Sequence, residues 1–562
     1  AHWAAGVYSW QSGQFDLYPV NPPLIRLIAC FPSVLLRPVA DFRDLETRPR
    51  VPGERLEWSA SIGFVKVNVG MVRIALFLGR LTILPWVILG AWLSWRWAGE
   101  LYGEPAACLA VALWCFSPSV LTWGGTIMPD LPAAASGLAA AYAFRNWLKA
   151  PGWETAVIAG VALGIAELTK MTWVILFAIW PTLWLLKLTT TRLKQWWLVE
   201  GLQCLTVMAL GVAVINAGYG YSGTGERLGN LSFASRLLAG SDSVVDGGKG
   251  GNRFHGQLMG QLPIPLPRDY LLGADLQKLD FERGLPSYLC GQWSSTGWWY
   301  YYLVCCALKI PLGSWIVLGV SLADRLSSHR VSRVDSQRLA LGIRFEELLL
   351  LIPAVCLFLL VSSQTGINQH FRYLLPAFPF VGVLASRAAV VSGSFPRLLV
   401  AGAILWNVSS SLWVFPHSMA YFNELAGGPA GGRRYLLHSN LDWGQDVWGL
   451  AEWCTLHPEA SPLHVAFRNS YSEELLRSHL SRASHRDAAK FRIVRLDRQA
   501  EPPDRHPLVS PGWYAISVHR MHEPDERYAP FLRMHRSATI GHTFDIFHVA
   551  EDSDADRHVE VK

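Results

Sequence analysis

The chain has 562 residues, of which 51% are hydrophobic and only 16% charged, and it contains 26 tryptophans. Soluble proteins carry about 25% charged residues, so this composition excludes an ordinary soluble enzyme and indicates a chain whose solvent is largely lipid. The formal net charge is +6, but arginines fall largely in short loops and in the C-terminal region, without a basic stripe interleaved with aromatic residues, so nucleic acid is not expected as a partner.

The nine cysteines show no pattern of a disulfide framework or a metal site. They are odd in number, lack a C-x-x-C spacing and mostly lie within apolar runs, as at Cys108, Cys204 and Cys356. Free cysteine behaves as a small hydrophobic residue, so we expect these side chains to be buried and unpaired.

Residues 1–71 are expected to form a first outer loop that carries helices close to the membrane. Beyond them, apolar segments recur at lengths that suit membrane-spanning helices, for which about 20 apolar residues are needed. We predict such helices within 72–219 and 298–415, at 72–98, 105–123, 130–148, 155–168, 171–187, 196–219, 298–321, 345–362, 373–390 and 398–415. The fourth and fifth segments are short and joined by Leu168 to Lys170, so they form either a tight hairpin or one broken helix.

Lysines and arginines fall on alternate connections between these segments, for example Arg96, Arg145, Lys187, Arg325 and Arg387. Such residues are retained on the cytoplasmic side of a membrane. The pattern favours the hairpin and places outside the segments 1–71, 126–130, 220–297, 363–372 and 416–562. We therefore expect a mainly α, polytopic protein of the cell (inner) membrane, with an extracytoplasmic C-terminal region.

The region 416–562 differs in character from the apolar segments before it. It contains strand-like runs at 463–467, 513–518 and 543–550 and helical patterns near 444–456 and 472–481, which predict a small α/β domain. The large outer loop 220–297 contains a glycine-rich stretch at 247–251 that indicates mobility, so this loop is a candidate lid.

Charged residues among the apolar segments are the first candidates for function, because each costs about 3 kcal/mol or more in hydrocarbon unless it is paired or faces a cavity. Asp130 begins a predicted helix, where it either caps the helix or faces an outward cavity as a base or metal ligand. Lys309 is followed by Ile310 and Pro311, which would open the helix. Its ammonium group then either extends to the interface or faces a phosphate.

Three further cations accompany them. Arg372 lies at the outer mouth of a predicted span, as an interface anchor or a phosphate clamp. Lys170 lies in the tight outer turn, and Glu167 is its nearest candidate partner in the sequence. Arg80 lies inside the first predicted span, where it is expected to pair with a carboxylate or a lipid phosphate.

The segment Pro416–Asp446, PHSMAYFNELAGGPAGGRRYLLHSNLDWGQD, is polar, aromatic and punctuated by glycine directly after the last apolar segment. It marks the start of the outer domain. Within it, Asp442 and Asp446 are four residues apart, and they either cap the start of a helix or bind a sugar or a metal.

An ordered set of motifs resembles the bacterial membrane glycosyltransferases related to the protein O-mannosyltransferases and the lipid A aminoarabinose transferases. Besides the segment just quoted, it comprises HWAAGVYSW from His2, FDLYPVNPPL from Phe15, MPDLP from Met128, GIAELTK from Gly164, SYLCGQWSSTGWWYY from Ser287, LKIPL from Leu308 and RYLLP from Arg372. Each motif is weak by itself, but together they run through nearly the whole chain.

The resemblance implies a GT-C type helix bundle with an outward-facing cavity and a polyprenyl-phosphate sugar as donor. It places the family's acidic pair, presumed catalytic, just before Ala1, so that the sequence would be a fragment lacking residues essential for activity; of that motif His2 remains. Asp130 matches the second outer-loop carboxylate, Lys309 and Arg372 match basic positions near the lipid phosphate, and Asn21 precedes the P-P-L element where the family more often has histidine.

From these residues we expect a glycosyltransferase, hexosyl- or pentosyl-, that inverts configuration in one displacement. The acidic pair, supported by Asp130, would act as base, and Lys309 and Arg372 would stabilise the leaving phosphate, with Lys170, Arg80 and Asn21 also binding substrate. No cofactor is required by the motifs, although a divalent metal at Asp130 stays open. The acceptor is a protein, lipid or glycan of the cell envelope.

The alternative is a polytopic transporter or lipid flippase, since buried charges in a helix bundle also mark substrate paths. The sequence shows no internal repeat and no paired broken helices in matching halves, and the outer domain has no evident task in transport. A non-catalytic scaffold is a third hypothesis, which an acidic pair in the upstream reading frame would contradict.

Overall fold

The structure is a computed structural model that describes all residues except 191–195, 332–336, 469–471, 482–490, 497–509 and 551–562. It divides into two compact units. The first, which we call the bundle unit, comprises Ala1–Phe64, Arg73–Ser287 and Ser294–Ser418. The second, the C-terminal unit, comprises Val65–Val72, Tyr288–Trp293 and the chain from Met419 onward.

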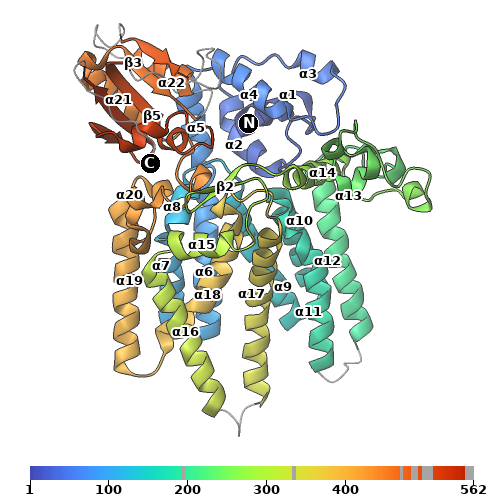
Figure 1. Ribbon diagram of the computed structural model, residues 1–562. Coiled ribbons are helices and arrows are strands. Elements are labelled where there is room, and N and C mark those ends of the chain that lie inside the picture. The colour runs from blue at the N-terminus through green and yellow to red at the C-terminus, as the bar shows by residue number, and fades with distance from the viewer. Residues whose placement is uncertain (191–195, 332–336, 469–471, 482–490, 497–509, 551–562) are drawn as a thin grey trace. The chain divides into compact units, whose positions relative to one another are not determined.

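Long apolar helices make up most of the bundle unit and run alongside one another (Figure 1). Each predicted span coincides with helix: α5 Val72–Leu81 and α6 Leu84–Tyr102, α7 Glu104–Cys115 and α8 Pro118–Gly124, α9 Asp130–Lys149, α10 Trp153–Thr169, η1 Met171–Ile175 and α11 Leu176–Thr190, α12 Trp197–Gly218, α15 Tyr301–Lys309 and α16 Leu312–Val331, α17 Gln337–Ser363, η6 Phe371–Ala377 with α18 Phe378–Ala385 and η7 Ser386–Val390, and α19 Ser394–Val414.

Six of these segments are long and apolar enough to cross a membrane among the described residues, or eight if each of two bent pairs counts as one span. The predicted class, a mainly helical polytopic membrane protein, is therefore confirmed. The remaining two predicted spans are also helices, but α10 has only 17 residues and α9 carries charges at both of its ends.

Two predicted spans are not single helices. α7 and α8 meet at an angle of 58°, and α15 and α16 at 107°. In both breaks a proline follows a residue with extended backbone, Ser117 before Pro118 and Ile310 before Pro311. Proline disfavours the helical conformation in the residue before it, which explains why 105–123 and 298–321 are wrong as continuous spans.

Shorter elements of the segments 1–71 and 220–297 complete the bundle unit. They are α1 His2–Ser12, α2 Leu24–Val34, α3 Arg43–Thr47, α4 Leu56–Val67, η2 Leu228–Asn230, α13 Arg236–Ala239, η3 Gly240–Asp242, η4 Val244–Asp246, η5 Leu258–Gln261 and α14 Arg268–Arg283. Most of α4 belongs to this unit, while its last residues belong to the C-terminal unit. In Figure 1, α13 and α14 lie across one end of the helices α10 and α12.

The opposite end of the bundle is held by ion pairs centred on Arg145, which is 1% exposed. Its guanidinium group pairs with Glu100 at 2.5 Å and with Glu346 at 2.6 Å, joining α9 to α6 and α17. Lys149 reaches Glu346 at 2.6 Å, and Arg96 reaches Glu100 at 2.8 Å. Several basic residues that the sequence places in connections are thus paired at helix ends.

The nine cysteines are all free, and four are buried. Cys108 is exposed on α7 and Cys290 is exposed as well, so the expectation of burial is wrong for these two side chains. An apolar run in a bundle helix has faces that do not meet other protein segments, and hydropathy alone does not say on which face a residue lies.

The C-terminal unit contains a five-stranded sheet in the order β4-β3-β5-β7-β6. Its strands are β3 Leu463–Ala466, β4 Ile493–Arg495, β5 Gly512–Ser517, β6 Ala538–Ile540 and β7 Phe544–Val549, with β3 parallel to both of its neighbours and β7 antiparallel to both of its own. The unit also has helices α20 Gly428–Gly432, α21 Val447–Leu456, α22 Ser472–Leu480 and α23 Val518–Met521. The small α/β domain is confirmed, and β4 and β6 are strands that the sequence patterns did not reveal.

A segment from the end of the long loop 220–297 joins this unit. β1 Ser287–Leu289 and β2 Gln292–Ser294 form a two-stranded sheet, and Trp293 Nε1 donates to the carbonyl oxygen of His522 at 2.6 Å. The Trp293 ring packs edge-on against His438 and His519, with centroids 5.5 and 5.9 Å away. The C-terminal unit is therefore assembled from parts of the chain that are distant in sequence.

Candidate active site

Three of the predicted site residues form one buried charge cluster in the bundle unit. Lys170 Nζ lies 2.6 Å from Asp130 Oδ1, and Arg372 Nε lies 3.3 Å from Asp130 Oδ2. Asp130 is 1% exposed, and Lys170 and Arg372 are each 7% exposed. One carboxylate thus pairs with two cations, and these three side chains together carry one net positive charge.

The local sequence explains how these side chains meet. Asp130 is the first residue of α9, directly after Pro129. Lys170 follows the end of α10 in an extended conformation, with φ −162° and ψ 129°, so it leaves the helix axis before η1 begins. Arg372 is in η6. All three residues therefore come from helix ends, where side chains are free to converge.

Asp130 does not cap its helix. The residue at the cap position is Pro129, and no side-chain hydrogen bond caps α9. A carboxylate in the first turn is favourable beside the positive end of the helix dipole, which offsets part of the cost of burial. The capping interpretation of Asp130 is therefore wrong, and its carboxylate instead pairs with Lys170 and Arg372.

Aromatic rings that the sequence did not single out border the cluster. Lys170 Nζ lies 4.7 Å from the centre of the Tyr373 ring, and the Arg372 guanidinium lies 5.1 Å from the Trp123 ring. Contacts of this kind stabilise a cation by about 0.5–2 kcal/mol. Their signal in the sequence was proximity alone: Tyr373 follows Arg372, and Trp123 is the last residue but one of the helix before Asp130.

Lys309 is the last residue of α15 and is 6% exposed. It lies seven residues after Tyr302, a spacing that puts both on one face of a helix, about 10 Å apart along its axis. Tyr302 is buried and within electrostatic reach of both Asp130 and Arg372. The break after Lys309, expected from Pro311, is present.

His2 is buried in α1 and lies within electrostatic reach of Arg372 and Arg26. Burial lowers the pKa of this imidazole well below its usual value, so the ring is neutral at pH 7. Among the described residues neither ring nitrogen has a hydrogen-bond partner, while the ring packs edge-on against Tyr18 at 5.0 Å.

Asn21 serves mainly to hold a buried arginine that the sequence interpretation missed. Its backbone oxygen accepts a hydrogen bond from Arg26 Nη1 at 2.8 Å, and its side-chain amide donates to the Tyr18 hydroxyl at 2.9 Å. Arg26 is 1% exposed and also donates to the carbonyl oxygens of Tyr18 and Phe15. An arginine inside the apolar run LIRLIACF was the available signal.

Two expected pairings are not found. Glu167 is not the partner of Lys170; its carboxylate instead accepts a hydrogen bond from the Tyr270 hydroxyl at 2.9 Å. Arg80 is exposed on α5, and in the described part of the chain no carboxylate pairs with it. Of its two predicted partners, the lipid phosphate therefore stays a prediction. The pairing of Glu167 with Lys170, predicted from their proximity in the sequence, is wrong because Lys170 leaves the helix in another direction.

A metal at Asp130 does not fit this arrangement well. Both carboxylate oxygens of Asp130 face cations, which a metal ion would have to displace. Within the described residues, no three His, Cys, Asp or Glu side chains gather in a way that would hold a metal ion. We therefore derive no step through a metal.

Asp442 and Asp446 stabilise loops of the C-terminal unit. Asp442 Oδ1 accepts a hydrogen bond from the Gly444 amide at 2.7 Å. Asp446 Oδ2 accepts from the Thr543 hydroxyl at 2.9 Å and from the His542 amide at 3.1 Å. Asp446 precedes α21, but its side chain does not cap that helix. The capping hypothesis is thus wrong for Asp446.

Comparison with known proteins gives a family match over part of the chain. Residues 74–216 match the family described as dolichyl-phosphate-mannose-protein mannosyltransferase. The segment runs from α5 to α12 and contains Asp130 and Lys170, so the predicted resemblance to membrane mannosyltransferases is confirmed for this part. No curated protein matches the chain.

Two solved structures are similar over most of their length. The crystal structure of ArnT from Cupriavidus metallidurans bound to undecaprenyl phosphate has a TM-score of 0.43 at 14% identity, and the apo structure of the same protein 0.44 at 13%. Each comparison covers 97% of this chain and 92% of the other.

Proposed function

We propose that the protein is an integral membrane glycosyltransferase that moves a sugar from a polyprenyl phosphate to an acceptor hydroxyl at the outer face of the membrane. The cluster of Asp130, Lys170 and Arg372 is the observation that carries this proposal. The family match supports it, because its description names a dolichyl-phosphate sugar as donor, and dolichyl phosphate is a polyprenyl phosphate.

The cluster supplies the two kinds of group that this reaction needs. The hydroxyl oxygen of the acceptor attacks the anomeric carbon, and a carboxylate oxygen of Asp130 accepts the proton of this hydroxyl. The bond between this carbon and the phosphate oxygen breaks, and its electron pair leaves on the phosphate. Lys170 and Arg372 turn from Asp130 to this phosphate as Asp130 becomes neutral, so the charges stay balanced throughout the step. One displacement inverts the anomeric configuration.

Lys309 has the supporting role of holding the lipid phosphate in this proposal. It is buried, it ends a helix at a sharp bend, and it shares a helix face with Tyr302 near the cluster. An ammonium group at that place adds a second point of attraction for an anion whose lipid tail lies along the apolar helices.

The test is sugar transfer by the protein reconstituted in lipid nanodiscs with radiolabelled polyprenyl-phosphate sugars and envelope extracts as acceptors. Asp130→Asn is expected to lower transfer by about a hundredfold or more, within the range for loss of a general base. Lys170→Met and Arg372→Met should lower the rate by a similar factor, as is found when one charge-stabilising group is removed.

The matched control is Arg236→Gln, which removes an exposed cation that pairs with Asp246 at 2.7 Å in the outer loop. It should transfer at the wild-type rate. Wild-type transfer by Asp130→Asn would overturn the assignment of the cluster. Uptake of lipid-linked sugar into vesicles, with no transfer to any acceptor, would instead favour a transporter or flippase.

A further inference from the structure

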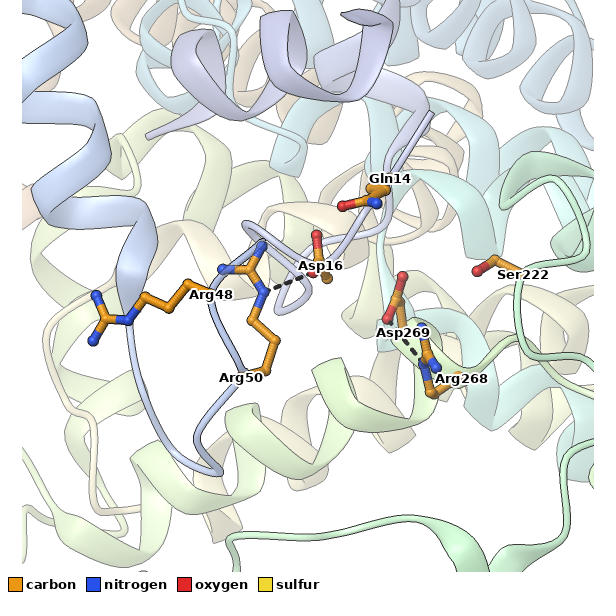
Figure 2. A pocket seen from close by; sticks show the side chains of 7 residues that line it. All are labelled: Gln14, Asp16, Arg48, Arg50, Ser222, Arg268 and Asp269. Carbon is orange, nitrogen blue, oxygen red and sulfur yellow. Dashed lines mark hydrogen bonds and ion pairs between the residues drawn. The ribbon is translucent and has the colours of Figure 1, made fainter. Parts of the chain in front are cut away.

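A second polar site lies in the outer segments of the bundle unit. It is a cavity of about 260 Å³ lined by seven polar or charged side chains: Gln14, Asp16, Arg48, Arg50, Ser222, Arg268 and Asp269. Figure 2 shows that they come from two sides, the segments around 14–16 and 48–50 facing Ser222 and the start of α14. Its volume is close to the lower end of the roughly 300–1,000 Å³ of small-molecule sites, which suits a single sugar ring.

One wall of the cavity is fixed by internal bonds. Arg50 Nε pairs with Asp16 Oδ2 at 2.7 Å, and the Tyr8 hydroxyl lies 2.5 Å from Gln14 Oε1 and 3.0 Å from Asp16 Oδ1. Arg48 reaches Glu54 at 2.6 Å. These groups are held in place before any ligand arrives, which reduces the ordering that binding requires.

The opposite wall carries groups whose hydrogen-bonding capacity is not used. Asp269 is 4% exposed, yet in the described part of the chain its carboxylate accepts no hydrogen bond, and its ion pair with Arg268 is as long as 3.8 Å. Arg268 is placed by its own amide, which donates to the Ser222 carbonyl oxygen at 3.1 Å. A Cβ atom on Gly223 would lie 2.5 Å from that of Arg268, so only glycine permits this close approach.

We infer that this cavity binds the acceptor through a saccharide unit that carries a carboxylate group. Sugar hydroxyls are hydrogen-bond donors, and Asp269 and Asp16 offer acceptors for them. The guanidinium groups of Arg268 and Arg48 suit a carboxylate, which they bind through two parallel hydrogen bonds. With Glu54, which pairs with Arg48, three arginines face three carboxylates, so the site is neutral overall and accommodates a singly charged carboxylate more readily than a doubly charged phosphate.

Hydrogen bonds link the cavity wall to the segment of His2. Arg26 donates at 3.3 Å to the carbonyl oxygen of Phe15, which lies between the lining residues Gln14 and Asp16. It also donates to the carbonyl oxygen of Tyr18, whose ring packs against His2 at 5.0 Å. His2 in turn lies within electrostatic reach of Arg372. An acceptor held in the cavity would thus have the segment of Arg26 and His2 between itself and Asp130. The role of this ligand as the acceptor rests on the proposed glycosyltransferase function. Binding of the ligand to the cavity does not depend on that function.

Binding of sodium glucuronate to the purified protein, measured by calorimetry without donor, is the test. Glucuronate should bind, with glucose and inorganic phosphate binding at least tenfold more weakly. Arg268→Gln should weaken glucuronate binding by about tenfold or more, as expected for loss of a charged hydrogen-bonding partner. Arg236→Gln should leave it unchanged, and a melting temperature equal to that of wild type shows that each variant is folded.

Equal binding of glucose, tighter binding of phosphate, or no binding of glucuronate would each overturn the inference. Asp130→Asn separates this result from the proposed function, because it should stop transfer while glucuronate still binds. In a transfer assay with an acidic glycan, Arg268→Gln should raise KM for the acceptor and leave KM for the donor unchanged. An equal change in both constants would contradict an acceptor site.

Discussion

At the scale of single residues, Asp269 makes the stability of the outer segments depend on pH. Burial, and secondarily the charge of Asp16, raise the pKa of its carboxyl to about 6. An unfolded aspartate has a pKa near 3.9, so the folded state binds more protons between about pH 4 and 6 and loses stability as pH rises through that window. Asp269→Asn should therefore stabilise the protein by about 1–3 kcal/mol at pH 7.5 and by less at pH 5, measured by thermal unfolding in detergent.

The control for this prediction is Asp246→Asn, which changes an exposed carboxylate whose pKa is lowered by Arg236. That substitution should bring no gain of stability at pH 7.5. Equal stabilisation by Asp269→Asn at pH 5 and pH 7.5 would show that the carboxyl titrates normally in the folded protein.

Single residues also show what the sequence reveals about a site. Asp130, Lys170 and Arg372 were recognisable because each is a charge among apolar residues. Their pairing was not, since Lys170 and Asp130 are 40 residues apart and the sequence offered Glu167 as a nearer partner. Arg26 was overlooked because its partners are backbone carbonyl oxygens, which leave no mark in a sequence.

At the scale of elements, hydropathy predicted where helices lie but not where they bend. Segments 105–123 and 298–321 are mostly apolar, and hydropathy is insensitive to backbone direction, whereas the bends depend on Pro118 and Pro311. The sharper bend has a functional consequence, because it places Lys309 at a helix end. A continuous helix would instead carry that ammonium group within a span.

Pro311→Ala tests the importance of this bend. Without proline, Ile310 is no longer kept out of the helical region, and α15 and α16 gain the freedom to straighten. We expect transfer to fall by roughly ten- to a hundredfold through misplacement of Lys309, with a higher KM for the lipid donor. Pro353→Ala is the matched control, since that proline lies inside the continuous helix α17 and its removal should leave transfer unchanged.

At the scale of the whole molecule, the charge cluster of the proposed reaction and the ion pairs that stabilise the bundle lie at opposite ends of α9. α9 carries Asp130 at its first residue and Arg145 in its last part, about 22 Å away along the helix at 1.5 Å per residue. The first end holds the charge cluster of the proposed reaction. The second end joins α6, α9 and α17 through ion pairs of 2.5 and 2.6 Å. Substitutions at the two ends should therefore have different effects.

Arg145→Leu should destabilise the protein by about 3 kcal/mol, near the lower limit for breaking a buried ion pair, because Arg96 and Lys149 still compensate Glu100 and Glu346. Transfer per folded molecule should stay at the wild-type level. Arg96→Leu, which removes an exposed member of the same network, should destabilise the protein much less, because solvent screens the ion pair. Unfolding in denaturant measures the stability of each variant, and transfer by its folded fraction measures its activity. Asp130→Asn should show the converse of Arg145→Leu, with transfer lost and stability retained. A loss of transfer in folded Arg145→Leu would mean that the two ends of α9 are coupled.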